Sequence, residues 1–183
     1  MDYQDNIKAH YIKNWKTEPN IFYWDKGPAH ELPYQFRVLE FEPTEHRKMW
    51  TYSTCCMSQE SDSLGIELHL FSARKDEGLI ELLTVTAHYH RTGHFLALSD
   101  TVNWGQPWQG NSICRHGLIS LPYLDGPDLE NLEFDNRIIK FYWLIPITKA
   151  EVEFKKEQGI NALEDEFEKQ GVDYLNHDRV SIV

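Results

Sequence analysis

The most constraining stretch of this sequence is R-I-I-K-F-Y-W-L-I-P-I at residues 137–147. Eight of the nine residues 138–146 are apolar or aromatic, and only Lys140 is charged. A strand with one face in water alternates apolar and polar side chains, so this run predicts a strand covered on both faces. Because Pro146 cannot donate a backbone hydrogen bond to a sheet, we expect the strand to end there.

Two short helices are predicted directly after this strand. Thr148 and Glu151 have the spacing of a capping box, in which each side chain accepts a hydrogen bond from the other residue's backbone N–H. Gly159 is typical of a helix end. A weaker box at residues 161–164 opens a second helix, which we expect to end at Gly171.

Hydrophobic periodicity predicts further elements along the chain. Residues 65–71 alternate strictly, which indicates a strand with one core face and one wetter face bearing Glu67 and His69. Amphipathic helices are expected at 2–16 and at about 76–91. Other strands are expected at 21–24, 35–41, 49–55 and 117–122, loops at 92–116 and 125–135, and an edge strand in the tail at 179–183.

These elements predict an α+β fold. We expect a mixed, twisted β-sheet with helices packed on it, formed as a single domain over residues 1–183. The length of 183 residues suits one domain of roughly 100–200 residues with a single core.

The charge balance restricts the partners of this chain. Asp and Glu number 29 against 18 Lys and Arg, which gives a net charge of −11. This charge opposes direct nucleic acid binding, which depends on cationic contacts to phosphate. It favours a basic partner, although simple solubility explains any single acidic patch equally well.

The sequence also predicts a compartment. The acidic, polar N-terminus does not resemble a signal peptide, and no stretch approaches the ~20 apolar residues of a membrane span. The three cysteines form no CxxC pair, which fits a reducing cytoplasm. We therefore expect a cytoplasmic protein with no membrane contact, and we make no prediction of its oligomeric state.

Residues that could carry catalysis or bind a metal are present but poorly arranged. His88, His90 and His94 invite a metal interpretation, yet Gly93 interrupts the helix that would align them and no Cys or carboxylate stands at a companion spacing. There is no G-x-S-x-G motif, and the vicinal cysteines at 55–56 lie in a β-rich run typical of buried thiols. We expect no enzyme activity, no metal and no cofactor.

One segment, from Tyr89 to Trp108, has the composition of a recognition surface. Asp100 follows an apolar run, and Trp104 and Trp108 come shortly after it. Rigid aromatic side chains near a carboxylate are typical of protein- or peptide-binding grooves. A packed surface loop has the same composition, and the residues alone leave both interpretations open.

Six blocks, in their order and spacing, resemble the Suppressor of fused domain family. The resemblance covers about residues 50–167, and Cys56 stands where the family commonly has Gly. The blocks are W-T-Y-S-T-C-C-M-S (50–58), G-I-E-L-H-L (65–70), A-H-Y (87–89), D-T-V-N-W (100–104), G-L-I-S-L-P-Y-L (117–124) and W-L-I-P-I-T-K-A-E (143–151), the last followed by G-I-N-A-L-E (159–164).

The resemblance implies a binding role. Animal members clamp an extended peptide of a zinc-finger transcription factor between two domains, and the Tyr and Asp that contact it correspond to Tyr89 and Asp100 here. We expect this chain to be too short for the second domain. Short, single-domain bacterial members occur beside toxin genes and are regarded as immunity proteins that neutralise toxins, often nucleases.

From the residues and the resemblance together we predict a protein-binding module that is not an enzyme. The leading interpretation is an immunity protein or antitoxin that blocks a basic toxin by direct binding, and the alternative is a regulatory scaffold that binds an extended peptide. The candidate partner-binding residues form one face of Tyr89, Asp100, Trp104 and Trp108, and an acidic face of Asp125, Asp128, Glu130 and Glu133.

Overall fold

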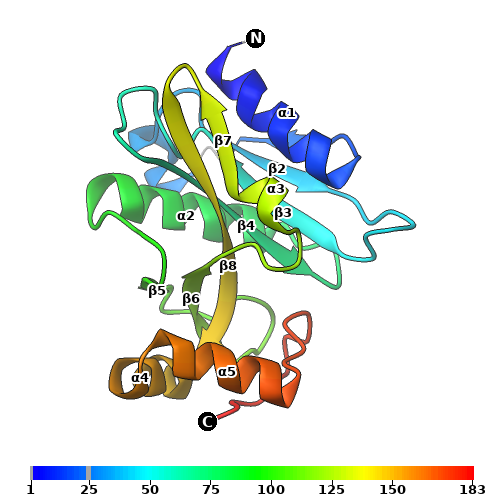
Figure 1. The fold of residues 1–183 in the computed structure, drawn as a ribbon, viewed down its shortest axis with the longest axis vertical. Coiled ribbons are helices and arrows are strands. Elements are labelled where there is room, and N and C mark those ends of the chain that lie inside the picture. Colours follow the sequence, from blue (N-terminus) through cyan, green and yellow to red (C-terminus); the bar gives the residue numbers. More distant parts are fainter. Residues whose placement is uncertain (1, 24–25) are drawn as a thin grey trace.

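The computed structural model describes residues 2–23 and 26–183, which form one mixed sheet with helices packed around it (Figure 1). The predicted α+β fold is confirmed. The strands are β1 (Asn20–Phe22), β2 (Arg37–Phe41), β3 (Trp50–Cys55), β4 (Gly65–Ser72), β5 (Thr101–Asn103), β6 (Cys114–Ser120), β7 (Asn131–Phe134) and β8 (Arg137–Thr148). The helices are α1 (Tyr3–Trp15), the 3-10 helix η1 (Gly27–Glu31), α2 (Gly78–Thr92), α3 (Pro127–Glu130), α4 (Lys149–Gln158) and α5 (Ile160–Gln170).

β8 is the central strand of the sheet. The strand order is β1-β2-β3-β4-β8-β6-β5, and β7 pairs with β8 beside this path. β8 runs parallel to β4 and antiparallel to β6 and β7. Its residues 141–148 are all buried, so the prediction of a strand covered on both faces is confirmed from Phe141 onward, whereas Ile138 is 44% exposed.

The expected end of this strand at Pro146 is wrong, because β8 continues to Thr148. Pro146 lies across from Gly117 of β6, while β4 accompanies β8 only as far as Trp143. The Pro146 carbonyl accepts a hydrogen bond from Arg179 Nη2 at 2.9 Å, so the backbone polar groups of this residue point away from β6. The missing N–H therefore faces a side where no strand requires a donor.

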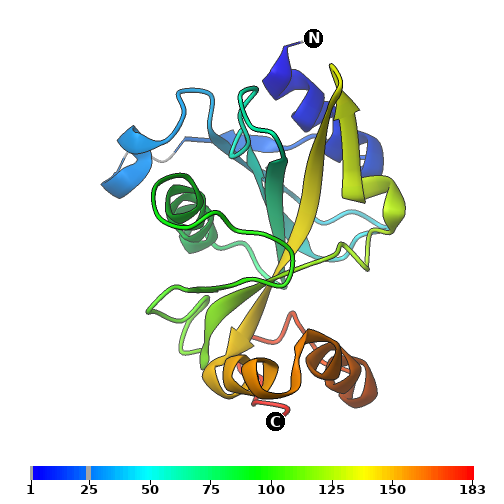
Figure 2. The same ribbon diagram turned by 60° about the vertical axis from the view of Figure 1, so that its left-hand side comes forward.

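The helices form layers on the two faces and at one end of the sheet (Figure 2). α2 covers one face, where Leu83 packs with Leu68 of β4. α1 and α3 cover the other face, where the Tyr11 ring meets Phe141 edge-on at 5.0 Å. α4 and α5 lie beyond the C-terminal end of β8 and build a third cluster around Trp143.

Local signals fix the start of α4 and the ends of α4 and α5. Both hydrogen bonds of the capping box between Thr148 and Glu151 are present at the start of α4. Gly159 ends α4, and Gly171 ends α5 in the left-handed conformation at φ 60°. The second predicted box is not formed, because α5 begins directly after Gly159 and Asn161 already lies inside the helix.

β4 lies wholly inside the molecule, so the expectation of a wetter face is wrong. Glu67 accepts hydrogen bonds from the Thr54 hydroxyl at 2.5 Å and from the Ser58 N–H at 3.0 Å. Burial nevertheless raises the pKa of Glu67 to about 7. The Glu67 carboxyl is thus satisfied by protein donors instead of water, whereas the ring nitrogens of the neighbouring His69 have no hydrogen-bond partner among the described residues.

Three irregular segments also differ from expectation. The expected loop at 92–116 contains β5 and the start of β6, and the acidic segment 125–135 folds into α3 and β7. The tail at 179–183 forms no strand. The strand predicted at 21–24 is present as β1, and Trp24 lies outside the described residues.

Candidate protein-binding surfaces

The corner between α2 and β5 carries the first predicted face. Tyr89, near the end of α2, is 40% exposed, and its carbonyl accepts hydrogen bonds from the N–H groups of Gly93 and His94. Asp100 precedes β5 and accepts from the Ala97 N–H at 2.8 Å. These bonds hold the segment between α2 and β5 at both of its ends. Tyr89 and Asp100 therefore lie at the two ends of one surface loop.

Trp104 joins this corner to the sheet. Its indole N–H donates to the Thr86 hydroxyl of α2 at 3.1 Å. The ring lies over Gly117 of β6, where a Cβ atom would stand 2.4 Å from Trp104 Cζ2. This close approach therefore requires a glycine at position 117. Trp104 is partly buried and contacts both α2 and β6.

Trp108 does not belong to this surface. Only 4% of the residue is exposed, and it lies in the core cluster beneath α2. We correct the sequence-based prediction at this position, because an indole inside the core has no face left for a partner. The structure brings Tyr89, Asp100 and Trp104 to one corner and leaves Trp108 out.

β5 is an edge strand whose outer side is open among the described residues. The Trp104 N–H donates to Arg115 O at 3.0 Å, and Asp100 O accepts from the Ile119 N–H at 2.9 Å, so these residues turn their backbone groups toward β6. The alternation of an antiparallel strand then turns those of Thr101 and Asn103 outward. An extended segment of another chain could pair there.

Asp125, predicted to belong to an acidic face, is instead an internal anchor. Its side chain is 3% exposed and lies against the Arg47 guanidinium. It accepts from the Trp15 indole N–H of α1 at 2.9 Å and stands 3.4 Å from His69 Nε2 of β4. Although burial alone would raise it, His69 and Arg47 hold the pKa of Asp125 at about 2. We correct this assignment, because the carboxylate is buried and already has its partners within the fold, so it is not available to another protein.

The other three residues of the acidic set do reach the surface. Asp128 and Glu130 lie on α3, and Glu133 lies on β7. Asp128 and Glu133 are exposed, and Glu130 is partly exposed. Within the described part of the chain, none of the three forms an ion pair. They belong to the α1 side of the sheet, so the two predicted sets do not form one continuous surface.

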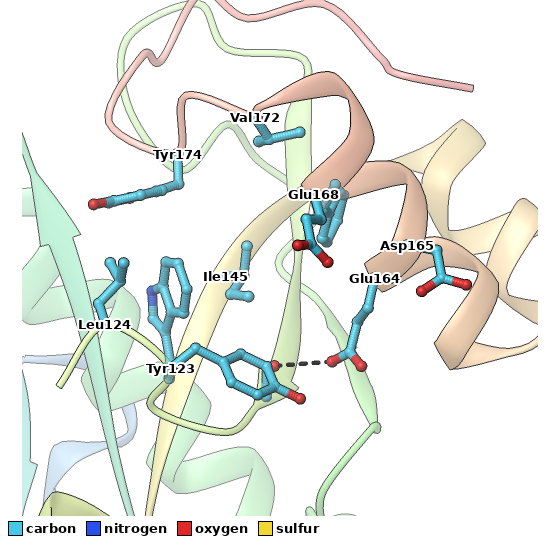
Figure 3. A pocket seen from close by; sticks show the side chains of 11 residues that line it. Tyr123, Leu124, Ile145, Glu164, Asp165, Glu168, Val172 and Tyr174 are labelled. Atoms are coloured by element: carbon cyan, nitrogen blue, oxygen red, sulfur yellow. Dashed lines mark hydrogen bonds between the residues drawn. The ribbon is translucent and has the colours of Figure 1, made fainter. Parts of the chain in front are cut away.

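A groove beneath α5, which we call the α5 groove, was not predicted from the sequence (Figure 3). It encloses about 580 Å³ between the end of β6, the middle of β8 and α5 with the turn that follows it. Its lining is mainly apolar with three acids along one side. The lining residues are Ser120, Tyr123, Leu124, Trp143, Ile145, Glu164, Asp165, Phe167, Glu168, Val172 and Tyr174.

The floor of the α5 groove is a cluster of packed aromatic rings. Trp143 meets the Tyr174 ring edge-on at 4.9 Å and the Phe71 ring at 5.4 Å, and only 7% of Trp143 is exposed. On the rim, Tyr123 and Leu124 are 59% and 47% exposed. Large apolar side chains in water beside a fixed apolar floor are typical of a surface that another molecule covers.

The opposite rim is negative. Figure 3 shows the Glu168 carboxylate turned toward the space beside Ile145, the Glu164 carboxylate beside the hydroxyl end of Tyr123, and Asp165 farther out on α5. The Ser120 hydroxyl donates to Glu164 at 3.2 Å, which orients that carboxylate. Burial and the nearby Glu164 raise the pKa of Tyr123. In the described structure these three acids have no cationic partner, whereas Glu166 on another face of α5 is paired with Lys169 at 2.8 Å.

The histidines do not build a metal site. His88 pairs with Glu31 at 2.7 Å, while His90 accepts from the Leu96 N–H at 3.0 Å and is buried. Burial lowers the pKa of His90 to about 4, so the ring is neutral and serves to hold the loop after α2. Among residues 2–23 and 26–183, no three His, Cys, Asp or Glu side chains are grouped as a metal ion would need.

The cysteines lie inside the fold. All three cysteines are buried and free. Contact with Cys56, together with burial, raises the pKa of Cys55, which leaves its thiol a poor nucleophile.

None of the helices that the structure describes combines the length and the hydropathy needed to cross a membrane.

Comparisons with known proteins place these surfaces in context. The family model described as Suppressor of fused protein (SUFU) matches residues 33–180. Immunity protein YqcF of Bacillus subtilis (strain 168) is 30% identical over 69 residues, which are 38% of this chain and 36% of YqcF. The match therefore spans only about a third of that curated relative.

Solved structures share the fold over nearly the whole chain. A Suppressor of fused homolog from Neisseria gonorrhoeae FA 1090 has a TM-score of 0.86 and 35% identity, covering 100% of this chain and 98% of that one. A chain of the Sufu–Fu complex has a TM-score of 0.71 and 15% identity, covering 98% of this chain and 92% of that one. Drosophila Suppressor of Fused has a TM-score of 0.69 and 16% identity, covering 96% of this chain and 50% of that one. At such low identity, the last two share the fold alone.

Proposed function

This chain belongs to the Suppressor of fused protein family, and from that membership we propose that it is a non-enzymatic protein-binding module, an immunity protein that neutralises a toxin by direct contact. The toxin is a basic protein, and a nuclease is the class that fits best. The chain acts by covering the toxin's working surface and carries out no reaction of its own.

The observation that carries the proposal is the set of carboxylates on the surface that have no cationic partner among the described residues. Asp128, Glu130 and Glu133 on α3 and β7, and Glu164 and Glu168 on α5, project into solvent or into the α5 groove. The match to immunity protein YqcF supports the same role, although it covers only 36% of that protein. The net charge of −11 adds a long-range attraction to any basic partner.

The mechanism follows from this charge. A nuclease holds phosphate in a basic cleft, and a partner rich in carboxylates competes for the same cations. Complementary charge speeds the encounter, and the bulk of the bound chain then excludes the substrate. The inhibition is therefore steric, and the electrostatic part of it weakens as salt rises.

Neutralisation of a cognate toxin tests the proposal. The full chain is mixed with a cognate toxin, sought first among genes adjacent to its own, toxin activity is measured, and the complex is followed by size-exclusion chromatography. We expect stoichiometric inhibition, and association that slows as salt increases. A chain that neither binds nor inhibits this toxin would overturn the proposal.

The open edge of β5 favours a second candidate, a regulatory scaffold that binds an extended peptide by strand addition. Tyr89 and Asp100, which match the peptide-contacting residues of animal members, lie next to that edge. A fold relative, Sufu, is solved in complex with Fu. For this chain the candidate remains second, because three residues of edge strand offer few backbone hydrogen bonds.

Substitution at this edge separates the two candidates. Tyr89→Phe and Asp100→Ala change the corner between α2 and β5 and leave the acidic residues of α3, β7 and α5 intact. If the chain is an immunity protein that binds through its acidic surfaces, both variants neutralise the toxin like the wild type. If the edge of β5 captures the partner, both variants lose binding.

A further inference from the structure

We propose that the α5 groove receives a cationic amphipathic segment of the partner protein, one that places large apolar side chains on the floor and a Lys or Arg beside Glu164 and Glu168. The inference rests on the proposed function and names the chemistry of the surface that this chain recognises. The residues that line the groove include neither Tyr89, Asp100 and Trp104 nor Glu133 of β7.

The apolar part of the ligand follows from the floor and the rim. At about 580 Å³ the groove lies within the range of roughly 300–1,000 Å³ typical of ligand pockets. Trp143 is held between Phe71 and Tyr174, so the floor is formed before anything binds. Tyr123 and Leu124 stand in water on the rim, and an inserted apolar side chain would cover both.

The cationic part follows from the acidic rim. Glu168 faces the space beside Ile145, and Glu164 lies beside the hydroxyl end of Tyr123 (Figure 3). Neither forms an ion pair among the described residues. Arg47 is close enough to the groove for its charge to lower the pKa of Tyr174, but it is already paired with Asp125. A Lys or Arg from a partner would meet two carboxylates, one of them already oriented by Ser120.

Charge also excludes other occupants. A second copy of this chain brings another −11 of charge, and a phosphate-bearing partner brings the same sign. A neutral apolar segment would fill the floor but leave both carboxylates without a cation and partly dehydrated. The combination of floor and rim therefore selects a segment that is both apolar and positive.

Peptide binding by the full chain tests the inference without a toxin. The probes are a short amphipathic peptide of Lys and Leu, a Lys–Ser peptide of equal charge, and a Glu–Leu peptide with the same apolar face. Affinity is measured by fluorescence anisotropy, and the site is mapped by NMR on ¹⁵N-labelled protein. We expect only the Lys–Leu peptide to bind tightly, with shifts at Tyr123, Leu124 and residues 164–174.

Matched variants separate the groove from general charge. The pair Glu164→Gln with Glu168→Gln should weaken Lys–Leu binding by about tenfold, the effect of losing two exposed charge pairs. The control pair Glu153→Gln with Glu157→Gln makes the same change in net charge on α4 and should change affinity by less than about twofold. Leu124→Lys, an exposed position, should also weaken binding, and an unchanged NMR spectrum confirms that each variant is folded.

Two peptide results would overturn the inference: equal binding of the Lys–Ser peptide, or equal losses in the α5 and α4 pairs. The toxin assay separates this failure from failure of the proposed function. If the wild type neutralises the toxin and the groove variants neutralise it equally well, the groove inference is wrong and the function stands. If the wild type binds the Lys–Leu peptide in the groove but does not affect the toxin, the function is wrong and the groove chemistry stands.

Discussion

The guanidinium of Arg179 lies against the carboxylate of Glu151, with 2.6 Å between Nη1 and Oε1 and 2.8 Å between Nη2 and Oε2. This pair connects the C-terminal tail to the capping box of α4, because the same carboxylate accepts from the Thr148 N–H at 2.7 Å. Both side chains are buried, at 8% and 0% exposure. The position of α4, and with it that of α5, depends on this contact.

We expect Arg179→Ala to destabilise the fold by roughly 3–5 kcal/mol, because it leaves the Glu151 carboxylate buried without its cation. The measurement is urea unfolding followed by circular dichroism. Lys156→Ala is the control, since Lys156 pairs with Glu153 on the exposed side of α4, and it should cost less than about 1 kcal/mol. Similar losses in the two variants would show that the buried pair contributes little.

Glu67 gives a pH dependence whose sign can be worked out. The folded carboxyl keeps its proton up to about pH 7, whereas the unfolded one ionises near its ordinary value of 4.5. The folded state therefore binds more protons in this window, and the contribution of Glu67 to stability falls as pH rises from about 4.5 to 7. Relative to Glu67→Gln, the wild type should lose on the order of 3 kcal/mol between pH 4.5 and 8.

Urea unfolding of both proteins at the two pH values measures this difference. The other titrating groups, including His69 and His90, are common to both chains and cancel in the comparison. A stability difference that stays constant with pH would show that Glu67 titrates in the folded chain as it does in the unfolded one.

Asp125→Asn should destabilise the fold, although Asp125 appears from the sequence to be a surface acid. The change removes the charge that faces Arg47 and His69, and we expect a loss of roughly 2–4 kcal/mol at neutral pH. Because the pKa of Asp125 is depressed to about 2, this stabilisation is present above its ordinary value of 3.8 and is lost as pH falls toward 2. Asp128→Asn, three residues away and exposed, should stay within about 0.5 kcal/mol of the wild type.

Gly117→Ala should be costly because its Cβ atom would stand 2.4 Å from Trp104 and 2.6 Å from Leu144. Overpacking of this kind typically costs about 1–3 kcal/mol. Trp104→Leu in the same chain should recover part of the loss, since the smaller side chain vacates the space over β6. Thermal unfolding of the single and double variants measures the coupling, and strictly additive losses would contradict the contact.

The exposed acids of α3 and β7 should act on association kinetics. Changing Asp128 to Asn and Glu130 and Glu133 to Gln removes three negative charges without breaking any ion pair among the described residues. If these residues steer a basic toxin, the association rate falls and its dependence on salt flattens, while stability is unchanged. Stopped-flow mixing at low and high salt makes the measurement. Rates equal to those of the wild type at low salt would exclude this surface from the encounter.

The parts of the fold that the sequence predicts well depend on neighbours in the chain. The run of apolar residues in β8 and the capping box at Thr148 are short patterns, and both are present as expected. The extension past Pro146 was missed because it depends on where β4 ends and on Arg179, 33 residues further along.

The errors at the site have the same origin. Asp125 lies in a run of five acids that resembles a solvated loop, yet its partners Trp15 and Arg47 are 110 and 78 residues away. The α5 groove combines residues from 120–124, 143–145 and 164–174. These segments are far apart in the sequence, so the hydrophobic periodicity within any one of them does not predict that they meet. The available signal was the adjacent apolar pair Tyr123 and Leu124, placed after a strand and outside any expected core.

The anchor at Asp125 has a mechanical consequence. Leu124, one wall of the α5 groove, precedes Asp125 directly in the chain, and Asp125 is gripped by Trp15 at the end of α1. The contacts of α1 with the rest of the fold, Trp15 with Asp125 and Tyr11 with Phe141 of β8, therefore lie close in the chain to residues that line the groove. The amino-terminal helix therefore holds in place the chain segment that supplies one rim of the groove.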